Sequence, residues 1–210
     1  MYGLFVKTHE PGVLTLIKVT TALLALGVSG TVFAVPETYQ IEPTHTFPSF
    51  ETDHMGGKSV WRGKVNKTSG VITLDRAAHN GAVEVTMEMS TINFGLEAMD
   101  KHARGADFLD VEKYPTASYK GKLTGWNADT PTAVEGELTL HGVTRPLKLT
   151  INSFMCKPNP MLKVDSCGAD ASASFNRDDF GIDGGKSFGF LMFVRLAIQV
   201  EANKVGPAAQ

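Results

Sequence analysis

The strongest constraint on the fold is a long alternating segment near the C-terminus, residues 187–200, SFGFLMFVRLAIQV. Every even position from Phe188 to Val200 is apolar, whereas the odd positions from Arg195 onward are mainly polar. Side chains alternate across a sheet with period two, so the pattern predicts one strand with one buried face. A strand of this length is typical of a barrel wall. An apolar barrel interior is either filled by side chains or open for an apolar ligand.

Shorter segments with the same alternation run through most of the chain. Residues 82–89 are the clearest, with Val83, Val85, Met87 and Met89 on one face. The composition, with 21 glycines between runs of Val, Ile, Thr and Phe, is typical of all-β proteins. The sequence predicts an all-β fold, an antiparallel β-barrel of about eight strands. The further predicted strands are 39–41, 117–126, 133–140, the strand beginning at Leu147, and 169–177.

Three segments depart from simple alternation. Pro48 interrupts residues 45–54, which predicts a bend or short helical turn, because proline cannot donate to a strand ladder. Residues 60–65 and 70–74 flank a turn-like stretch, which predicts a hairpin. Residues 97–114 are charged and helix-prone, with a break expected at Gly105. We expect this short helical insertion to lie across an end or a side of the barrel.

The front of the chain has the features of a secretory signal peptide. Basic Lys7 and Lys18 precede the short apolar stretch 19–30, and small residues, Val32 and Ala34, follow it. We predict a signal peptide over 1–34, cleaved after Ala34, then a barrel domain over 35–205 and a disordered tail over 206–210. An uncleaved anchor is the alternative. The nearly balanced net charge of −2 does not indicate nucleic acid or an anionic membrane surface as a partner.

Cys156 and Cys167 are the only cysteines, and they bracket a stretch rich in turn-forming residues. In an exported protein such a pair indicates a disulfide, which would stabilise the fold by about 2–3 kcal/mol. A metal site would require further thiol or imidazole partners at short spacing, and the sequence places none beside them.

Catalytic motifs such as HExxH or CxxC do not occur in the sequence, so we predict that the protein is not an enzyme and binds no metal. Asp178 and Asp179 beside Arg177 fit a turn or a loop ion pair better than a catalytic carboxylate pair. A metal-dependent or redox enzyme remains the alternative, because five histidines outside the signal peptide could meet in space. They are His45, His54, His79, His102 and His141.

Aromatic residues occur in nearly every predicted element. They would either pack a filled core or line an apolar cavity, and the alternation alone favours neither reading.

Four segments resemble the YceI-like family: residues 39–57, 106–119, 137–149 and 175–183. The resemblance implies a lipocalin-like barrel in the bacterial periplasm, with a cavity for a long isoprenoid lipid, either a polyprenyl phosphate or an isoprenoid quinone. It implies a carrier with no cofactor other than this lipid. The loop between the cysteines also resembles that of a disulfide-containing subgroup. A filled barrel without ligand, serving a stress-related role, is the alternative.

Under this resemblance we expect the cavity lining to be largely aromatic. The candidate ligand-binding residues are Phe50, Trp61, Phe108, Tyr119, Phe175, Phe188, Phe190 and Met192. Four polar residues that match the family motifs are expected to be structural or to form the cavity mouth. They are His45, Asp107, His141 and Arg177. Transient membrane contact, and either a monomer or a homodimer, are compatible with this reading.

Overall fold

The computed structural model describes residues 1–3 and 35–206. Nearly all of the predicted signal peptide, its cleavage site and nearly all of the predicted tail lie outside these residues and stay predictions. The described residues 35–206 belong to one compact unit, which contains the described helices and strands. Within the described part of the chain, no helix is both long enough and apolar enough to span a membrane.

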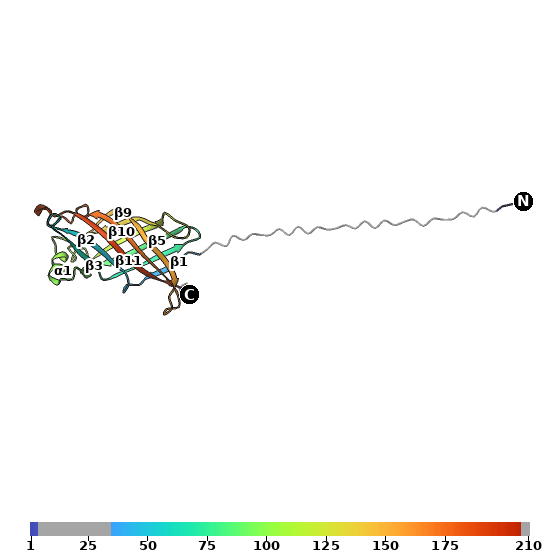
Figure 1. Ribbon diagram of the computed structural model, residues 1–210, viewed down its shortest axis with the longest axis horizontal. Coiled ribbons are helices and arrows are strands. Elements are labelled where there is room, and N and C mark those ends of the chain that lie inside the picture. Colours follow the sequence, from blue (N-terminus) through green and yellow to red (C-terminus); the bar gives the residue numbers. More distant parts are fainter. Residues whose placement is uncertain (4–34, 207–210) are drawn as a thin grey trace. The chain divides into compact units, whose positions relative to one another are not determined.

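The core of this unit is a closed antiparallel barrel, and its strands run obliquely to the long axis of the barrel (Figure 1). The circuit closes where β1 pairs with β11, from Thr38 opposite Val205 to Ile41 opposite Ala202. This confirms the predicted antiparallel barrel of about eight strands. In order round the wall, the strands are β1 (Glu37–Ile41), β4 (Thr68–Asp75), β5 (Asn80–Glu88), β7 (Thr116–Thr124), β8 (Ala133–Leu140), β9 (Val143–Pro158), β10 (Asp165–Asn176) and β11 (Phe193–Val205).

Strand β2 (Phe47–His54) continues the wall beyond β1, along the same edge of β11. The predicted bend at Pro48 is wrong, because Pro48 lies inside β2 opposite Ile198. Pairing of β2 with β3 (Ser59–Val65) begins only at Ser49, so Pro48 stands where the ladder has one partner strand. A proline is tolerated at such an edge position.

The predicted hairpin between β3 and β4 is also wrong. Strand β3 pairs with β2 and with the short β6 (Ile92–Asn93), whereas β4 pairs with β1 and β5. Residues 66 and 67, which connect β3 to β4, are instead bonded to Thr91, at the end of the 3₁₀ turn Met89–Thr91. The backbone N–H of Asn66 donates to the Thr91 carbonyl at 3.2 Å, and that of Lys67 donates to the Thr91 hydroxyl at 3.1 Å.

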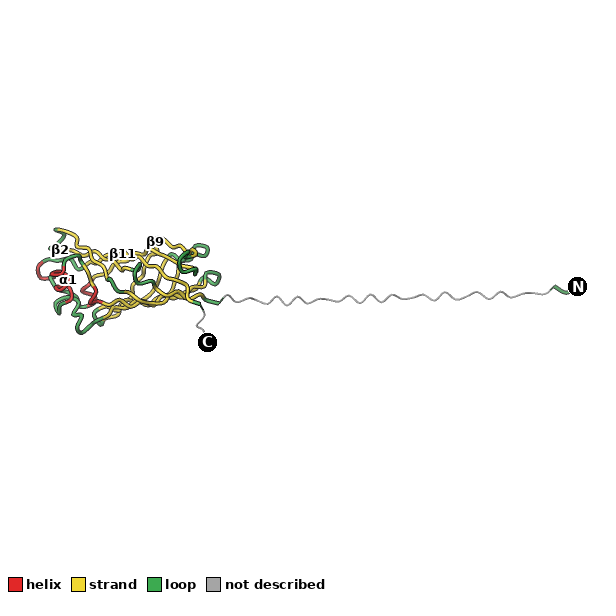
Figure 2. The backbone as a smooth tube through the Cα atoms, turned by 90° about the horizontal axis from the view of Figure 1, so that it is seen from below, coloured by secondary structure: helices red, strands yellow, loops and turns green. Residues whose placement is uncertain are grey.

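Helix α1 (Glu97–Arg104) lies at one end of the barrel, and the C-terminal end of β11 lies at the other end (Figures 1 and 2). The predicted helical insertion at a barrel end is therefore confirmed, with its break at Gly105, although residues 106–115 form turns. The side chain of Asp100 fixes the entry to the helix, because its Oδ1 accepts the N–H of Phe94 at 2.6 Å.

The long C-terminal strand begins at Phe193 rather than Ser187, and runs on to Val205. Before it lie two 3₁₀ turns, Arg177–Phe180 and Lys186–Phe188. Gly185 and Gly189 flank the second turn with φ of +80° and +81°, a backbone conformation that glycine adopts readily. The apolar alternation therefore extends from the strand into a loop, which the sequence pattern alone did not reveal.

The predicted disulfide is confirmed. Cys156 on β9 and Cys167 on β10 are directly opposite each other in the ladder and are bonded. They join the two strands near the tip of the β9–β10 hairpin, which carries Met161 and Leu162.

Candidate ligand-binding cavity

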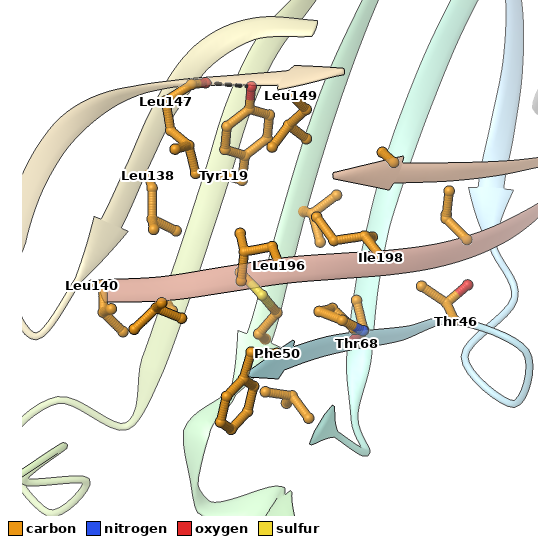
Figure 3. Close-up of a pocket in the computed structure, with 18 of the residues that line it drawn as sticks. Thr46, Phe50, Thr68, Tyr119, Leu138, Leu140, Leu147, Leu149, Leu196 and Ile198 are labelled. Carbon is orange, nitrogen blue, oxygen red and sulfur yellow. Dashed lines mark hydrogen bonds between the residues drawn. The ribbon is translucent and has the colours of Figure 1, made fainter. Parts of the chain in front are cut away.

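The barrel encloses a cavity of about 400 Å³, a volume within the range of small-molecule sites. Its wall consists of the inward-facing side chains of the strands. Leucines of β8 and β9 form one side, while Leu196 and Ile198 of β11 form another (Figure 3). The predicted inward face of β5 is confirmed, because Val83, Val85 and Met87 all line the cavity, as does Met89 just after it.

The interior is hollow rather than filled. Inward-facing Val85, Met87, Leu196 and Ile198 remain partly exposed, although the wall shields them from the outside. This exposure arises because they border unfilled space and not other side chains. The structure thus favours the open-cavity reading of the aromatic and aliphatic residues over the filled-barrel reading.

The few polar groups in the wall are mostly bonded to the main chain. The Tyr119 hydroxyl lies 2.9 Å from the Leu147 carbonyl and 3.3 Å from that of Val134 (Figure 3). Burial raises the pKa of Tyr119 to about 12, so its phenol is neutral at physiological pH. The Thr46 hydroxyl donates to the Glu201 carbonyl at 3.1 Å. The wall therefore presents an almost wholly apolar surface.

The cavity is closed at one end and reaches the surface at the other. At the closed end, the floor is made by the buried side chains of Tyr39, Leu74 and Ala202. At the α1 end, six lining residues are partly or fully exposed, although others such as Ala103 are buried, and we call this end the mouth. The mouth residues are His54, Trp61, Phe94, His102, Phe108 and Phe190.

Aromatic rings form a continuous arc along one side of the mouth. The Phe94 ring lies 5.3 Å from that of Phe50 and 6.1 Å from that of Trp61, centroid to centroid. The His54 ring continues the arc, 5.3 Å from Trp61 and 5.4 Å from Phe190. Such edge-on contacts hold the rings in fixed orientations.

Arg177 organises the other side of the mouth. Its side chain is buried, and its two terminal nitrogens donate to the carbonyls of Ile182 at 2.8 Å and Gly184 at 2.7 Å. The guanidinium also lies 5.7 Å from the centre of the Phe108 ring. Burial lowers the pKa of Arg177, although nearby carboxylates, Asp178 first among them, oppose this shift. Arg177 thus fixes the loop before β11, in agreement with the structural or mouth-forming role expected of it.

The structure brings six of the eight predicted ligand-binding residues to the cavity lining. Met192 is buried but outside the lining, and Phe188 is 80% exposed on the outer surface. The placement of Phe188 on an inward strand face is wrong, because the Gly185–Gly189 turn separates it from β11. The six residues in the lining are Phe50, Trp61, Phe108, Tyr119, Phe175 and Phe190.

The sequence prediction missed the aliphatic part of the lining. The strand parity placed Leu138, Leu140, Leu147 and Leu149 on one face, yet only aromatic residues and Met192 were proposed as ligand contacts. Inward parity alone would have identified these leucines as lining residues.

His54 and His102 line the mouth, whereas His45, His79 and His141 lie outside the cavity lining. His79 stacks on Trp126, and His141 packs against Tyr114 with its Nδ1 3.1 Å from the Phe180 carbonyl. In the ranges 1–3 and 35–206, no group of three or more His, Cys, Asp or Glu residues is placed to hold a metal ion. Asp178 forms the expected loop ion pair, 2.7 Å from Lys186.

A closed antiparallel barrel with a one-ended apolar cavity defines a lipocalin-like class of fold. The model of the YceI-like domain matches residues 39–204 of this chain. A UPF0312 protein of Pseudomonas putida is 31% identical over 176 residues, which cover 80% of this chain and 90% of that protein. The chain therefore belongs to the YceI-like family, as the sequence motifs indicated.

Solved structures show the same fold. The YceI protein of Campylobacter jejuni superposes with a TM-score of 0.60 at 23% identity, covering 70% of this chain and 87% of that one. A polyisoprenoid-binding domain from Saccharophagus degradans superposes with a TM-score of 0.55 at 11% identity, covering 80% and 98%.

Proposed function

We propose that this protein is a periplasmic carrier that holds a long isoprenoid lipid, a polyprenyl phosphate or an isoprenoid quinone, in its barrel cavity. The observation that carries the proposal is the hollow, one-ended cavity with an almost wholly apolar wall. Burial of each CH₂ group contributes about 0.8 kcal/mol, so a long hydrocarbon tail binds without polar anchors. The polyisoprenoid-binding domain with the same fold supports this ligand class.

The chemistry of the lining favours binding over catalysis. The Asp53 carboxylate, the one acidic group among the described residues that line the cavity, accepts three backbone N–H bonds, from Gly56, Gly57 and Leu191. These bonds, that from Leu191 first, lower the pKa of Asp53 and occupy its oxygens. A carboxylate held in this way is a poor general base. We therefore propose that the protein is not an enzyme and needs no cofactor.

The periplasmic location rests on the signal-like segment 1–34 and agrees with the Cys156–Cys167 disulfide, because disulfides persist in oxidising compartments. Mass analysis of the exported protein tests it. A mature N-terminus at Val35 is expected, and a protein retained uncleaved in the cytoplasm would contradict it.

The ligand can be tested with the protein's own fluorescence. Trp61 lines the mouth, whereas the second tryptophan, Trp126, lies outside the lining. In the Trp126→Phe variant, Trp61 is the sole reporter, and binding of a short-chain isoprenoid quinone is expected to quench it saturably. A polyprenyl phosphate, which does not quench, should reverse the effect by displacement if it occupies the same cavity.

A paired substitution separates cavity binding from surface adsorption. Val85→Trp places a large side chain in the cavity, whereas Thr86→Trp places the same side chain on the exposed face of β5. In isotherms with tritiated quinone, we expect Val85→Trp to weaken binding at least about tenfold and Thr86→Trp to leave it nearly unchanged. Equal binding by both folded variants would contradict a ligand inside the barrel.

A further inference from the structure

Exposed apolar side chains gather at the mouth of the barrel. Phe188 is 80% exposed and Leu191 is 55% exposed, in the loop before β11. Exposed Met55 and Val60 lie in the turn between β2 and β3 and at the start of β3, and exposed Phe193 begins β11. We call these five residues the mouth rim. Large exposed apolar groups that gather in this way mark interaction surfaces.

The two segments of the mouth rim are bound to each other. Asp53 joins them, because its carboxylate accepts the N–H groups of Gly56 at 2.9 Å and Gly57 at 2.5 Å on one side, and of Leu191 at 2.8 Å on the other. The backbones also approach closely, since a Cβ atom added at Gly56 would lie 3.0 Å from the Gly189 carbonyl oxygen. The apolar side chains are therefore presented on a shared, hydrogen-bonded base.

The mouth rim is continuous with the cavity. Val60 is exposed while its neighbour Trp61 lines the cavity, and exposed Phe188 and Leu191 lie on either side of Phe190, which also lines it. Along both segments, apolar side chains thus lead from the outer surface into the interior. An apolar chain that follows this route would stay in contact with apolar surface.

The charged groups of the same segments are mostly paired. Residues 55–62 and 185–195 contain four basic residues, Lys58, Arg62, Lys186 and Arg195. Glu51 behind the rim binds both Arg62 and Arg195, each at 2.8 Å, and Asp178 binds Lys186 at 2.7 Å. With the Asp53 carboxylate beneath the rim, the charge around the apolar patch is nearly balanced. Such a patch suits a bilayer interface, where apolar side chains insert and long basic side chains reach the headgroups.

We propose that the mouth rim docks on a phospholipid bilayer, with the open end of the barrel facing the lipid. This inference rests on the proposed carrier function and adds the surface through which cargo enters and leaves. A long isoprenoid chain would then pass between bilayer and cavity without exposing its length to water, which costs about 0.8 kcal/mol per CH₂.

The opposite end of the barrel offers a matched control. The tip of the β9–β10 hairpin exposes Met161 by 88% and Leu162 by 55%, so it is as apolar as the rim but remote from the mouth. The double variants to compare are Phe188→Ser with Leu191→Ser, and Met161→Ser with Leu162→Ser. Each is tested by flotation with vesicles of phosphatidylglycerol and phosphatidylethanolamine, and with phosphatidylcholine vesicles.

The native protein is expected to float with both kinds of vesicle and to stay bound as salt is raised, because the contact is apolar and salt screens only charges. The rim variant should bind these vesicles at least about tenfold more weakly, and the hairpin variant within about twofold of the native protein. Quinone quenching of Trp61 without vesicles should be the same in the rim variant, since neither substituted residue lines the cavity. This readout also shows that the variant is folded.

Three results would overturn the docking surface: a native protein that binds quinone but no vesicles, a hairpin variant that alone loses vesicle binding, or a rim variant that only breaks a dimer in sedimentation. The last would assign the rim to self-association. Vesicle binding by a native protein that takes up no isoprenoid would leave the docking surface in place and instead contradict the proposed cargo.

Discussion

At the scale of single residues, most polar groups of the cavity wall are bonded to the main chain, although the buried Thr68 hydroxyl has no hydrogen-bond partner among the described residues. Tyr119 is the clearest example of this bonding. Its ring forms part of the wall, while its hydroxyl donates to the Leu147 carbonyl on β9 and lies 3.3 Å from the Val134 carbonyl on β8. Its side chain thus joins the inner surfaces of neighbouring strands without offering a polar contact to a ligand.

Replacement of Tyr119 by phenylalanine tests this structural role. The variant leaves the buried carbonyl of Leu147 without its side-chain partner, so the free energy of unfolding should fall by about 1–2 kcal/mol. Urea denaturation followed by circular dichroism measures the change, and the slope of the transition should be unaltered. Quinone affinity should change little. A large loss of affinity with unchanged stability would instead make the hydroxyl a ligand contact.

Strand parity predicted side-chain direction well wherever a strand exists. Tyr119 and Phe175 face the cavity as expected. Phe188 does not, because parity has no meaning once glycines with positive φ turn the backbone. The mouth residues His54 and Phe94 were not selected, since their proximity depends on contacts between segments far apart in sequence.

At the scale of the elements, the β9–β10 hairpin depends on a covalent link. The Cys156–Cys167 bond joins opposite residues of the two strands near the hairpin tip. The tip contributes Met161 and Leu162 to the surface and no side chain to the cavity lining. Cys167 itself lines the cavity, so the disulfide should support the cavity wall as well as the stability of the fold.

Substitution of both cysteines by serine is expected to lower the free energy of unfolding by about 2–3 kcal/mol, mainly because the unfolded chain gains freedom. Urea denaturation with and without reductant measures this. Reductant should destabilise the native protein to a similar extent and leave the double variant unchanged. Equal stability of the native protein and the double variant, each with and without reductant, would contradict the stabilising role of the disulfide.

The presence of most strands followed from their alternation, but their pairing did not. Residues 60–65 and 70–74 are consecutive strands that the sequence favoured as a hairpin, yet β3 and β4 pair with other partners. Pairing is decided by barrel closure and by contacts such as those of Thr91 with Asn66 and Lys67, which join distant segments. Local pattern contains no information on such contacts.

At the scale of the whole molecule, closure of the sheet creates the cavity, which opens at one end of the barrel. The β1–β11 seam closes the wall, the buried Tyr39, Leu74 and Ala202 seal the floor, and the α1 end leaves an opening. The sequence predicted the barrel but left open whether it was filled. The volume left inside depends on how all inward side chains pack together, which no single strand determines.

The most direct test of this account is mass spectrometry of an organic extract of the protein, purified without detergent from its own host. The account predicts a co-purifying polyprenyl phosphate or isoprenoid quinone, at about one molecule per chain, since an eight-stranded barrel holds a single ligand. The Val85→Trp variant, prepared in the same way, should yield far less. A folded native protein whose extract contains no isoprenoid would contradict the carrier function.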